Sequence, residues 1–239
     1  MGMRAPLVLM YHSVADPEQD PNLLRVSPER FDQQLAWLHR QGLRGVSVKE
    51  LSRASERGAA SGLVGITFDD GYRDFLTSAL PMLERYGFTA TLFAVAGLVG
   101  GVNVWDGGQG WSLLDRDELL EVKGRGIEIG SHGMTHVRLA GLDHGTLRRE
   151  VRDSRELLSE LLGGAVHGFC YPYGSLDDRA MRAVREAGYA YGCGVKVPSA
   201  AVSTFSLPRM HVGQEDGAFR LTVKRRIYRA YAQTVGRGR

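Results

Sequence analysis

The stretch LVGITFDDGYRD, residues 63–74, places two adjacent carboxylates directly after an apolar run. The run at 63–68 is rich in β-branched residues, which predicts a buried strand, and the residues after it predict a turn into a helix. Adjacent like charges such as Asp69 and Asp70 raise each other's pKa and destabilise the fold unless a positive charge lies beside them. The stretch therefore predicts a strand that ends at a cation.

Further runs of the same kind alternate with amphipathic segments along the chain. Helices are expected from Ser27, an N-cap followed by proline, to Gly42, and over 74–85, 146–162 and 177–187. Regular alternation of this kind implies a parallel sheet covered by helices, and seven units favour a barrel over an open sheet. The predicted strands are 7–14, 63–68, 90–96, 127–131, 168–171, 189–194 and 206–211.

Composition limits the class of protein. The 239 residues are 43% hydrophobic and 24% charged, and the net charge is +3, so we expect one globular domain over 1–239 and no nucleic-acid partner. No apolar stretch is long enough to predict an integral membrane segment, and the start of the chain does not resemble a signal peptide. The expected location is cytoplasmic, although a secreted chain whose leader had been removed would look the same. The basic tail from Lys224 onward is interpreted as a solvated helix face and chain end rather than a membrane or nucleic-acid patch.

A second polar motif, SHGMTH at 131–136, follows the predicted strand at 127–131. In a parallel barrel such motifs meet at the C-terminal ends of the strands. His132 and His136 are four residues apart, so on a helical turn both imidazoles would reach one ion, and one carboxylate would complete a metal site. The other carboxylate of the Asp69–Asp70 pair would point away from the metal, as alternate residues of a strand do, and face the bound water. Each motif alone is more often a turn or a chance pair, but together they predict metal-assisted hydrolysis of an amide or ester.

These motifs carry a resemblance. TFDDG, then SHGMTH, then FCYPYG at 169–174 resemble, in this order, the polysaccharide deacetylase family, the NodB-homology domain of family-4 carbohydrate esterases. The resemblance extends from Leu9 to about Val212. It implies a distorted (β/α)7 TIM-like barrel that hydrolyses N-acetyl groups, usually on N-acetylglucosamine units, with Zn²⁺ or another divalent ion such as Co²⁺, Ni²⁺ or Mn²⁺.

The resemblance also implies roles for individual residues. Asp69 would be the general base, and Tyr173 would donate its backbone N–H to the oxyanion. The metal ligands would be Asp70, His132 and His136.

The chain departs from the family pattern at one position. The family has an arginine two residues before Pro172, where this chain has Cys170. That arginine orients the base, and Arg209 is the candidate to replace it; the alternative for Arg209 is an ion pair at the barrel end.

The general acid has two candidates, His12 and His211. A similarity to circularly permuted family members, which open with Tyr-His, favours His12. The alternative for each histidine is a hydrogen-bonded core residue.

The function expected from these residues is removal of N-acetyl groups from an N-acetylated sugar or glycan. Trp105, in the glycine-rich loop at 97–110, and Trp111, directly after it, would form a sugar-stacking wall or pack within the loop. Tyr72 and Arg73 would contact the substrate or support the helix that begins at Asp74. One alternative is hydrolysis of a cyclic imide or ureide on the same barrel. Another is a non-catalytic carbohydrate-binding protein on a degenerate barrel, which the missing motif arginine would support.

Overall fold

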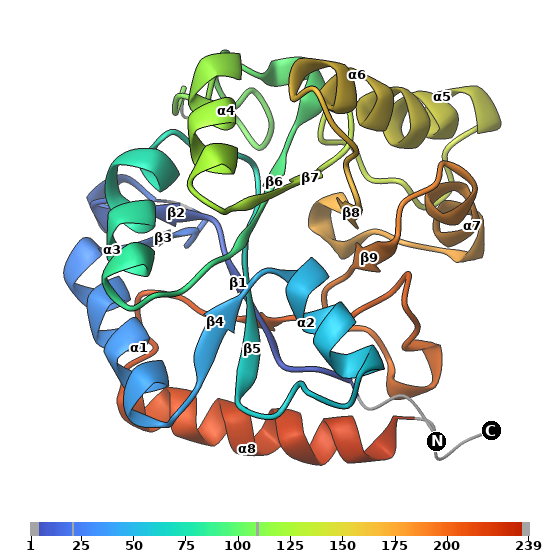
Figure 1. Cartoon of the computed structure of the whole chain (residues 1–239). Coiled ribbons are helices and arrows are strands. Elements are labelled where there is room, and N and C mark those ends of the chain that lie inside the picture. Colours follow the sequence, from blue (N-terminus) through green and yellow to red (C-terminus); the bar gives the residue numbers. More distant parts are fainter. Residues whose placement is uncertain (1–4, 21, 109, 236–239) are drawn as a thin grey trace.

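A computed structural model describes residues 5–20, 22–108 and 110–235 of the chain. In this part, one curled parallel sheet has the strand order β10-β1-β5-β6-β7-β8-β9, and β4 also pairs with β5 (Figure 1). A separate parallel pair, β2 and β3, lies beside it. The strands are β1 (Val8–Tyr11), β2 (Ser13–Val14), β3 (Arg25–Val26), β4 (Arg44–Val46), β5 (Leu63–Phe68), β6 (Thr91–Ala94), β7 (Glu128–Ser131), β8 (Gly168–Cys170), β9 (Tyr191–Cys193) and β10 (Met210–His211).

Helices surround the sheet (Figure 1). Two of the helical segments contain a five-residue π-helical stretch, Phe75–Ala79 before α3 and Arg149–Asp153 between α5 and α6. The α-helices are α1 (Pro28–Arg40), α2 (Val48–Glu56), α3 (Leu80–Arg85), α4 (Arg116–Gly124), α5 (His144–Arg148), α6 (Ser154–Leu161), α7 (Asp178–Glu186) and α8 (Ala218–Thr234).

The ends of the sheet approach each other through one short segment. Leu207 forms a parallel bridge with Cys193 at the end of β9, and three residues later Met210 pairs with Leu9 of β1. Residues 207–211 therefore connect β1 with β9. The resulting curled barrel confirms the predicted fold class.

The predicted strands correspond to the seven strands on the path of the sheet; β5 has the predicted bounds, and the other six are shorter than predicted. The strand expected at 7–14 is divided at His12 into β1 and β2. The sequence analysis missed β3, β4, α2 and α4, and the predicted single domain includes residues 1–4 and 236–239, which lie outside the described part. Ser27 caps α1 as expected, because its Oγ accepts the N–H of Arg30 at 3.2 Å.

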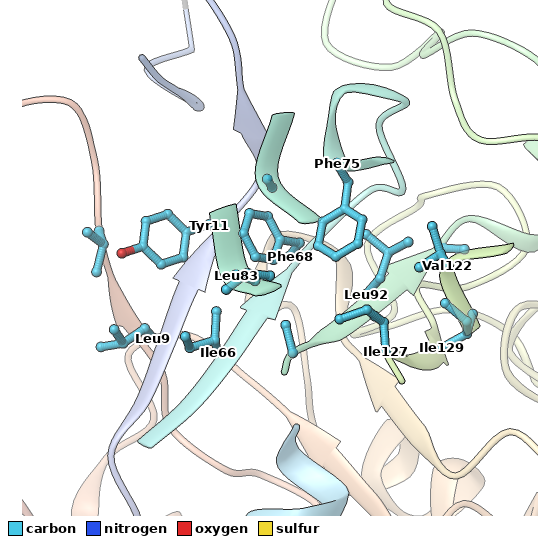
Figure 2. Close-up of a cluster of buried hydrophobic side chains, with 14 of the residues drawn as sticks. Leu9, Tyr11, Ile66, Phe68, Phe75, Leu83, Leu92, Val122, Ile127 and Ile129 are labelled. Carbon is cyan, nitrogen blue, oxygen red and sulfur yellow. The ribbon is translucent and has the colours of Figure 1, made fainter. Parts of the chain in front are cut away.

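A cluster of buried aromatic rings supports the strand that leads to the two aspartates (Figure 2). Phe68, the last residue of β5, is fully buried and stacks on Tyr11 of β1 with ring centroids 5.3 Å apart. Its edges meet Phe31 at 5.7 Å and Phe75 at 4.8 Å in T-shaped contacts. This packing fixes the end of β5, and with it the start of the turn at Asp69.

No helix within the described residues is both long and apolar enough to span a bilayer.

We predict that Phe68→Ala lowers the free energy of unfolding by about 3–5 kcal/mol, because it removes a fully buried ring and leaves a cavity. Phe68→Leu, which refills most of the volume, should lose much less. Urea denaturation followed by circular dichroism measures both. Equal losses in the two variants would show that the ring's volume does not support this end of β5.

Candidate functional site

A pocket of about 260 Å³ opens at the C-terminal ends of the strands. The loops after β1, β5, β6, β7, β8 and β9 contribute its walls together with β10 and the residue before it, as expected for a barrel. The eight residues predicted for the site all line it, which brings together positions from 12 to 211. They are His12, Asp69, Asp70, His132, His136, Tyr173, Arg209 and His211.

Arg209 and Asp69 form a buried, bidentate ion pair. Arg209 donates from Nη1 to Asp69 Oδ1 at 2.6 Å and from Nη2 to Oδ2 at 2.8 Å, and its side chain is 0% exposed. Arg209 also donates to Thr67 Oγ1 at 3.0 Å and to the Gly194 carbonyl at 3.3 Å. The planar guanidinium therefore fixes the orientation of the carboxylate.

Cys170 occupies the space beside this pair. Its Sγ accepts a hydrogen bond from Arg209 Nη2 at 2.9 Å and donates to Asp69 Oδ2 at 3.5 Å. Burial raises the pKa of the Cys170 thiol well above its usual range, so it remains a neutral donor. Burial would also raise the pKa of Asp69, but the charge and hydrogen bonds of Arg209 outweigh it and lower that pKa. Asp69 is thus ionised at neutral pH.

Asp70 points differently from Asp69 because the chain turns there. Asp70 has φ +74° and Gly71 φ +81°, both in the left-handed region. A Cβ on Gly71 would lie 3.3 Å from the Cα of Ala94, so glycine is required for this close approach. The expectation that alternate directions along a strand separate the two carboxylates was wrong, since β5 ends at Phe68 and the turn separates them.

The carboxylate of Asp70 faces two imidazoles. Asp70 Oδ1 lies 3.4 Å from His132 Nε2 and 3.2 Å from His136 Nε2, and all three residues are buried. Burial would raise the pKa of Asp70, but the neighbouring imidazoles of His132 and His136 hold it well below its usual range.

These three residues fit a divalent metal. His132 Nδ1 donates to the Cys170 carbonyl at 2.8 Å, so in the neutral ring Nε2 carries the lone pair that faces Asp70. Asp70 Oδ1 is itself buried without a hydrogen-bond partner among the described residues. Two acceptor atoms that face each other in a buried site require a cation or a proton between them. A metal-ligating histidine commonly donates its other nitrogen to a carbonyl in this way.

The segment that carries the two histidines is a loop, which corrects the predicted helical turn. Gly133 has φ +83° and His136 has φ +64°, neither compatible with a helix. Glu150, buried in the π-helical stretch, accepts the N–H of Met134 at 2.8 Å and that of Thr135 at 3.0 Å. These bonds replace the ones that a helix would make, so the imidazoles converge through loop geometry.

Glu150 is a positioning residue that the sequence analysis missed. It also accepts the Thr135 hydroxyl at 2.5 Å, so all three of its hydrogen bonds go to the loop between the histidines. Glu150 lies in the amphipathic segment predicted at 146–162. Only its burial distinguishes it from the other charged residues of that segment.

Aromatic residues form one wall of the pocket. Trp105 stacks on the His136 ring with centroids 4.2 Å apart, and Tyr173 meets the same ring edge-on at 4.7 Å. Tyr173 has φ +58°, and its hydroxyl donates to Asp106 at 3.0 Å. Arg138 covers the Tyr173 ring from outside, 4.3 Å from its centroid. Trp105 and Tyr173 therefore hold the His136 ring between them.

Other expected substrate contacts lie elsewhere. Trp111 and Tyr72 do not line the pocket; they pack on each other with centroids 5.4 Å apart, and the Arg25 guanidinium covers Trp111. Tyr72 is fully buried, and Arg73 pairs with Glu118 at 2.6 Å. These residues anchor the loop around the pocket instead of lining it.

The two candidate acids lie side by side. The rings of His12 and His211 have centroids 6.5 Å apart, and His12 Nε2 lies 3.9 Å from Asp69 Oδ2. Burial, His12 and Lys224 all lower the pKa of His211, which favours its neutral form.

Comparisons with known proteins match this fold and site. A family model for polysaccharide deacetylase matches residues 57–192, more than half of the chain. YxkH of Bacillus subtilis (strain 168) is 30% identical over 187 residues, 77% of this chain and 62% of that protein, so this chain spans about three-fifths of its length. The poly-beta-1,6-N-acetyl-D-glucosamine N-deacetylase of Staphylococcus aureus (strain MRSA252) is 24% identical over 84% of this chain and 71% of its own length.

Solved structures show the same architecture. The Streptococcus pyogenes deacetylase PplD in complex with acetate has a TM-score of 0.77 and 26% identity, over 94% of this chain and 99% of that chain. IcaB from Ammonifex degensii has a TM-score of 0.74 and 24% identity, over 97% of this chain and 98% of that chain, and shares the fold.

We predict that Arg209→Met, in metal-free protein with chelator present, reverses the direction in which the contribution of Asp69 to stability depends on pH. In the wild type the lowered pKa of Asp69 means that the ion pair stabilises the fold above the unfolded pKa of about 3.9, and that this stability is lost as pH falls through the folded pKa. In the variant, no guanidinium opposes the effect of burial, so the pKa of Asp69 in the folded state is raised. The stability of the variant therefore falls as pH rises through this raised pKa. The variant should be about 3–5 kcal/mol less stable at pH near 7, with a much smaller deficit below about pH 4.

Urea denaturation at the two pH values measures the difference. Adding Asp69→Asn to the variant removes the unpaired charge and should recover much of the loss at neutral pH. A deficit that does not change with pH would contradict the ion-pair account.

Proposed function

Because the chain belongs to the polysaccharide deacetylase family, we propose that it is a metal-dependent hydrolase that removes N-acetyl groups from an N-acetylglucosamine-type glycan. The observation that carries this proposal is the different surroundings of the two adjacent carboxylates. Asp69 is held by Arg209, whereas Asp70 faces His132 and His136. A base and a metal ligand side by side are the parts that hydrolysis of an amide requires.

Asp70, His132 and His136 would hold the metal, with Zn²⁺ as the first candidate and Co²⁺, Ni²⁺ or Mn²⁺ as alternatives. When bound, such an ion polarises the acyl oxygen and lowers the pKa of water. The loop held by Glu150 presents the two imidazoles, and Trp105 and Tyr173 restrict the ring of His136. These contacts restrict the orientation of both imidazoles.

Asp69 would act as the general base. Its lowered pKa keeps it ionised, and Arg209 orients it toward the pocket, so it can accept the proton of the attacking water. The Tyr173 backbone N–H would then donate to the oxygen of the tetrahedral intermediate.

His12 would protonate the departing amine. Its Nε2 lies near Asp69 Oδ2, so base and acid face the same small volume of the pocket. His211 is the weaker candidate, because its lowered pKa leaves fewer rings protonated at neutral pH. We assign His211 to binding at the pocket edge.

The substrate class rests on the relatives and the pocket. The Staphylococcus aureus relative is a deacetylase of poly-beta-1,6-N-acetyl-D-glucosamine. A pocket of about 260 Å³ suits an acetamido group and its sugar ring, with the rest of a glycan lying outside. The degenerate-barrel alternative loses its main support, because Arg209 supplies the guanidinium that position 170 lacks. No observation favours a cyclic imide over an N-acetyl sugar.

We predict that Asp69→Asn slows acetate release from N-acetylglucosamine oligomers by about 10²–10⁴-fold and leaves zinc stoichiometry unchanged. Asp70→Asn should lose both zinc and turnover, because it removes a ligand. Acetate is measured enzymatically on protein that has been stripped and reloaded with zinc, and zinc by isothermal titration. Full turnover in Asp69→Asn would exclude this residue as the base.

We also predict that His12→Ala slows release from N-acetyl sugars by about 10²-fold but has a much smaller effect on an acetate ester whose leaving group needs no proton. His211→Ala should raise KM more than it lowers kcat. Steady-state kinetics on the two substrate types separate the roles. The opposite pattern in the two variants would transfer the acid role to His211.

A further inference from the structure

The last helix, α8, is apolar on two faces. Leu221 and Tyr228 point inward and are buried. On the outer side Phe219 is 81% exposed, Val223 is 38% exposed and Ile227 is 64% exposed. These three residues are four apart and form one stripe along the helix. A helix that packs on a core normally presents polar residues outward, so an exposed apolar stripe of this kind indicates a surface that binds a partner.

The charged side chains within α8 are all positive. Residues 218–234 contain five cationic side chains and no acidic one. Arg220 and Lys224 are paired with Asp216, whereas Arg226 and Arg229 are exposed, and among the described residues no acidic group lies within salt-bridge distance of either. Arg226 is one helical turn from Val223, so the unpaired cations border the stripe. The partner should therefore be apolar within and negatively charged at its surface.

An apolar groove joins this face to the candidate site. It has a volume of about 410 Å³ and lies between α8, β10 and residues 195–197. Ile227 of the stripe forms part of its wall, and it shares Val195, Arg209 and His211 with the site pocket. The outer face of α8 and the pocket therefore open toward a common region of the surface.

We propose that the outer face of α8 docks this protein on an anionic lipid bilayer. Phe219, Val223 and Ile227 enter the boundary between headgroups and acyl chains, while Arg226 and Arg229 contact lipid phosphates. A nucleic acid would use the arginines but leave the apolar stripe exposed, and a second copy would bring two positive faces together. This docking is independent of the proposed reaction, and it would bring the groove and pocket close to glycans at a membrane surface.

Vesicle co-sedimentation with the full chain tests the proposal. The protein should bind phosphatidylcholine vesicles that contain about a third phosphatidylglycerol, bind pure phosphatidylcholine far more weakly, and be released by high salt. Arg226→Gln with Arg229→Gln should weaken binding by about thirtyfold, at about fivefold per charge. Phe219→Ser with Val223→Ser and Ile227→Ser should weaken binding at least about tenfold at low salt, although these changes leave the net charge unaltered.

A matched control changes two exposed arginines on other helices. Arg148→Gln in α5 with Arg179→Gln in α7 lowers the net charge by the same amount and should change binding by less than about twofold. Unchanged circular dichroism spectra and melting temperatures establish that every variant folds.

Three results would overturn the proposal. The first is no binding to anionic vesicles, and the second is equal weakening by the α8 and control arginine pairs, which would mean that net charge alone acts. The third is a concentration-dependent dimer of the wild type, absent from the serine variant, without vesicle binding, because the stripe would then be a contact between two copies.

Discussion

The structure depends on a guanidinium that is withdrawn from water. Arg209 is fully buried, so its charge must be compensated inside the barrel, and Asp69 supplies that compensation through two hydrogen bonds. The same side chain binds Thr67 of β5 and the carbonyl of Gly194 after β9. One residue thus ties the closing segment at 207–211 to strands on both sides of the sheet. The group that orients the proposed base also holds the barrel together.

The residues around this ion pair give the neighbouring carboxylates different partners. The aromatic cluster around Phe68 fixes the end of β5, and the left-handed turn at Asp70 and Gly71 directs the second carboxylate toward the histidines. Glu150 then sets the loop between His132 and His136 through hydrogen bonds to its backbone and Thr135. Each carboxylate, Asp69, Asp70 and Glu150, has a separate set of partners, which is how three buried acids coexist near one site.

Local patterns in the sequence identified much of this arrangement. Strand periodicity, the cap at Ser27 and the order of the motifs predicted the seven strands of the path and eight residues that line one pocket. Features set by distant partners were missed. The loop of His132 and His136 was taken for a helical turn because spacing alone cannot reveal Gly133 at positive φ or a carboxylate from Glu150. The three-residue strand β4 and Trp111, which packs inward on Tyr72, likewise depend on contacts that no local signal encodes.

The Asp69–Arg209 pair also has a consequence for how the molecule is assembled. The two partners are 140 positions apart, so during synthesis Asp69 leaves the ribosome long before its counter-ion exists. Until residues 207–211 pair with β1 and reach β9, burial of the Asp69 carboxylate is unfavourable because it has no counter-ion. The partly folded barrel is therefore more stable with that end open to water. Closure of the fold and completion of the site are then a single late event. A partly folded chain would carry the TFDDG motif without the guanidinium that orients the Asp69 carboxylate.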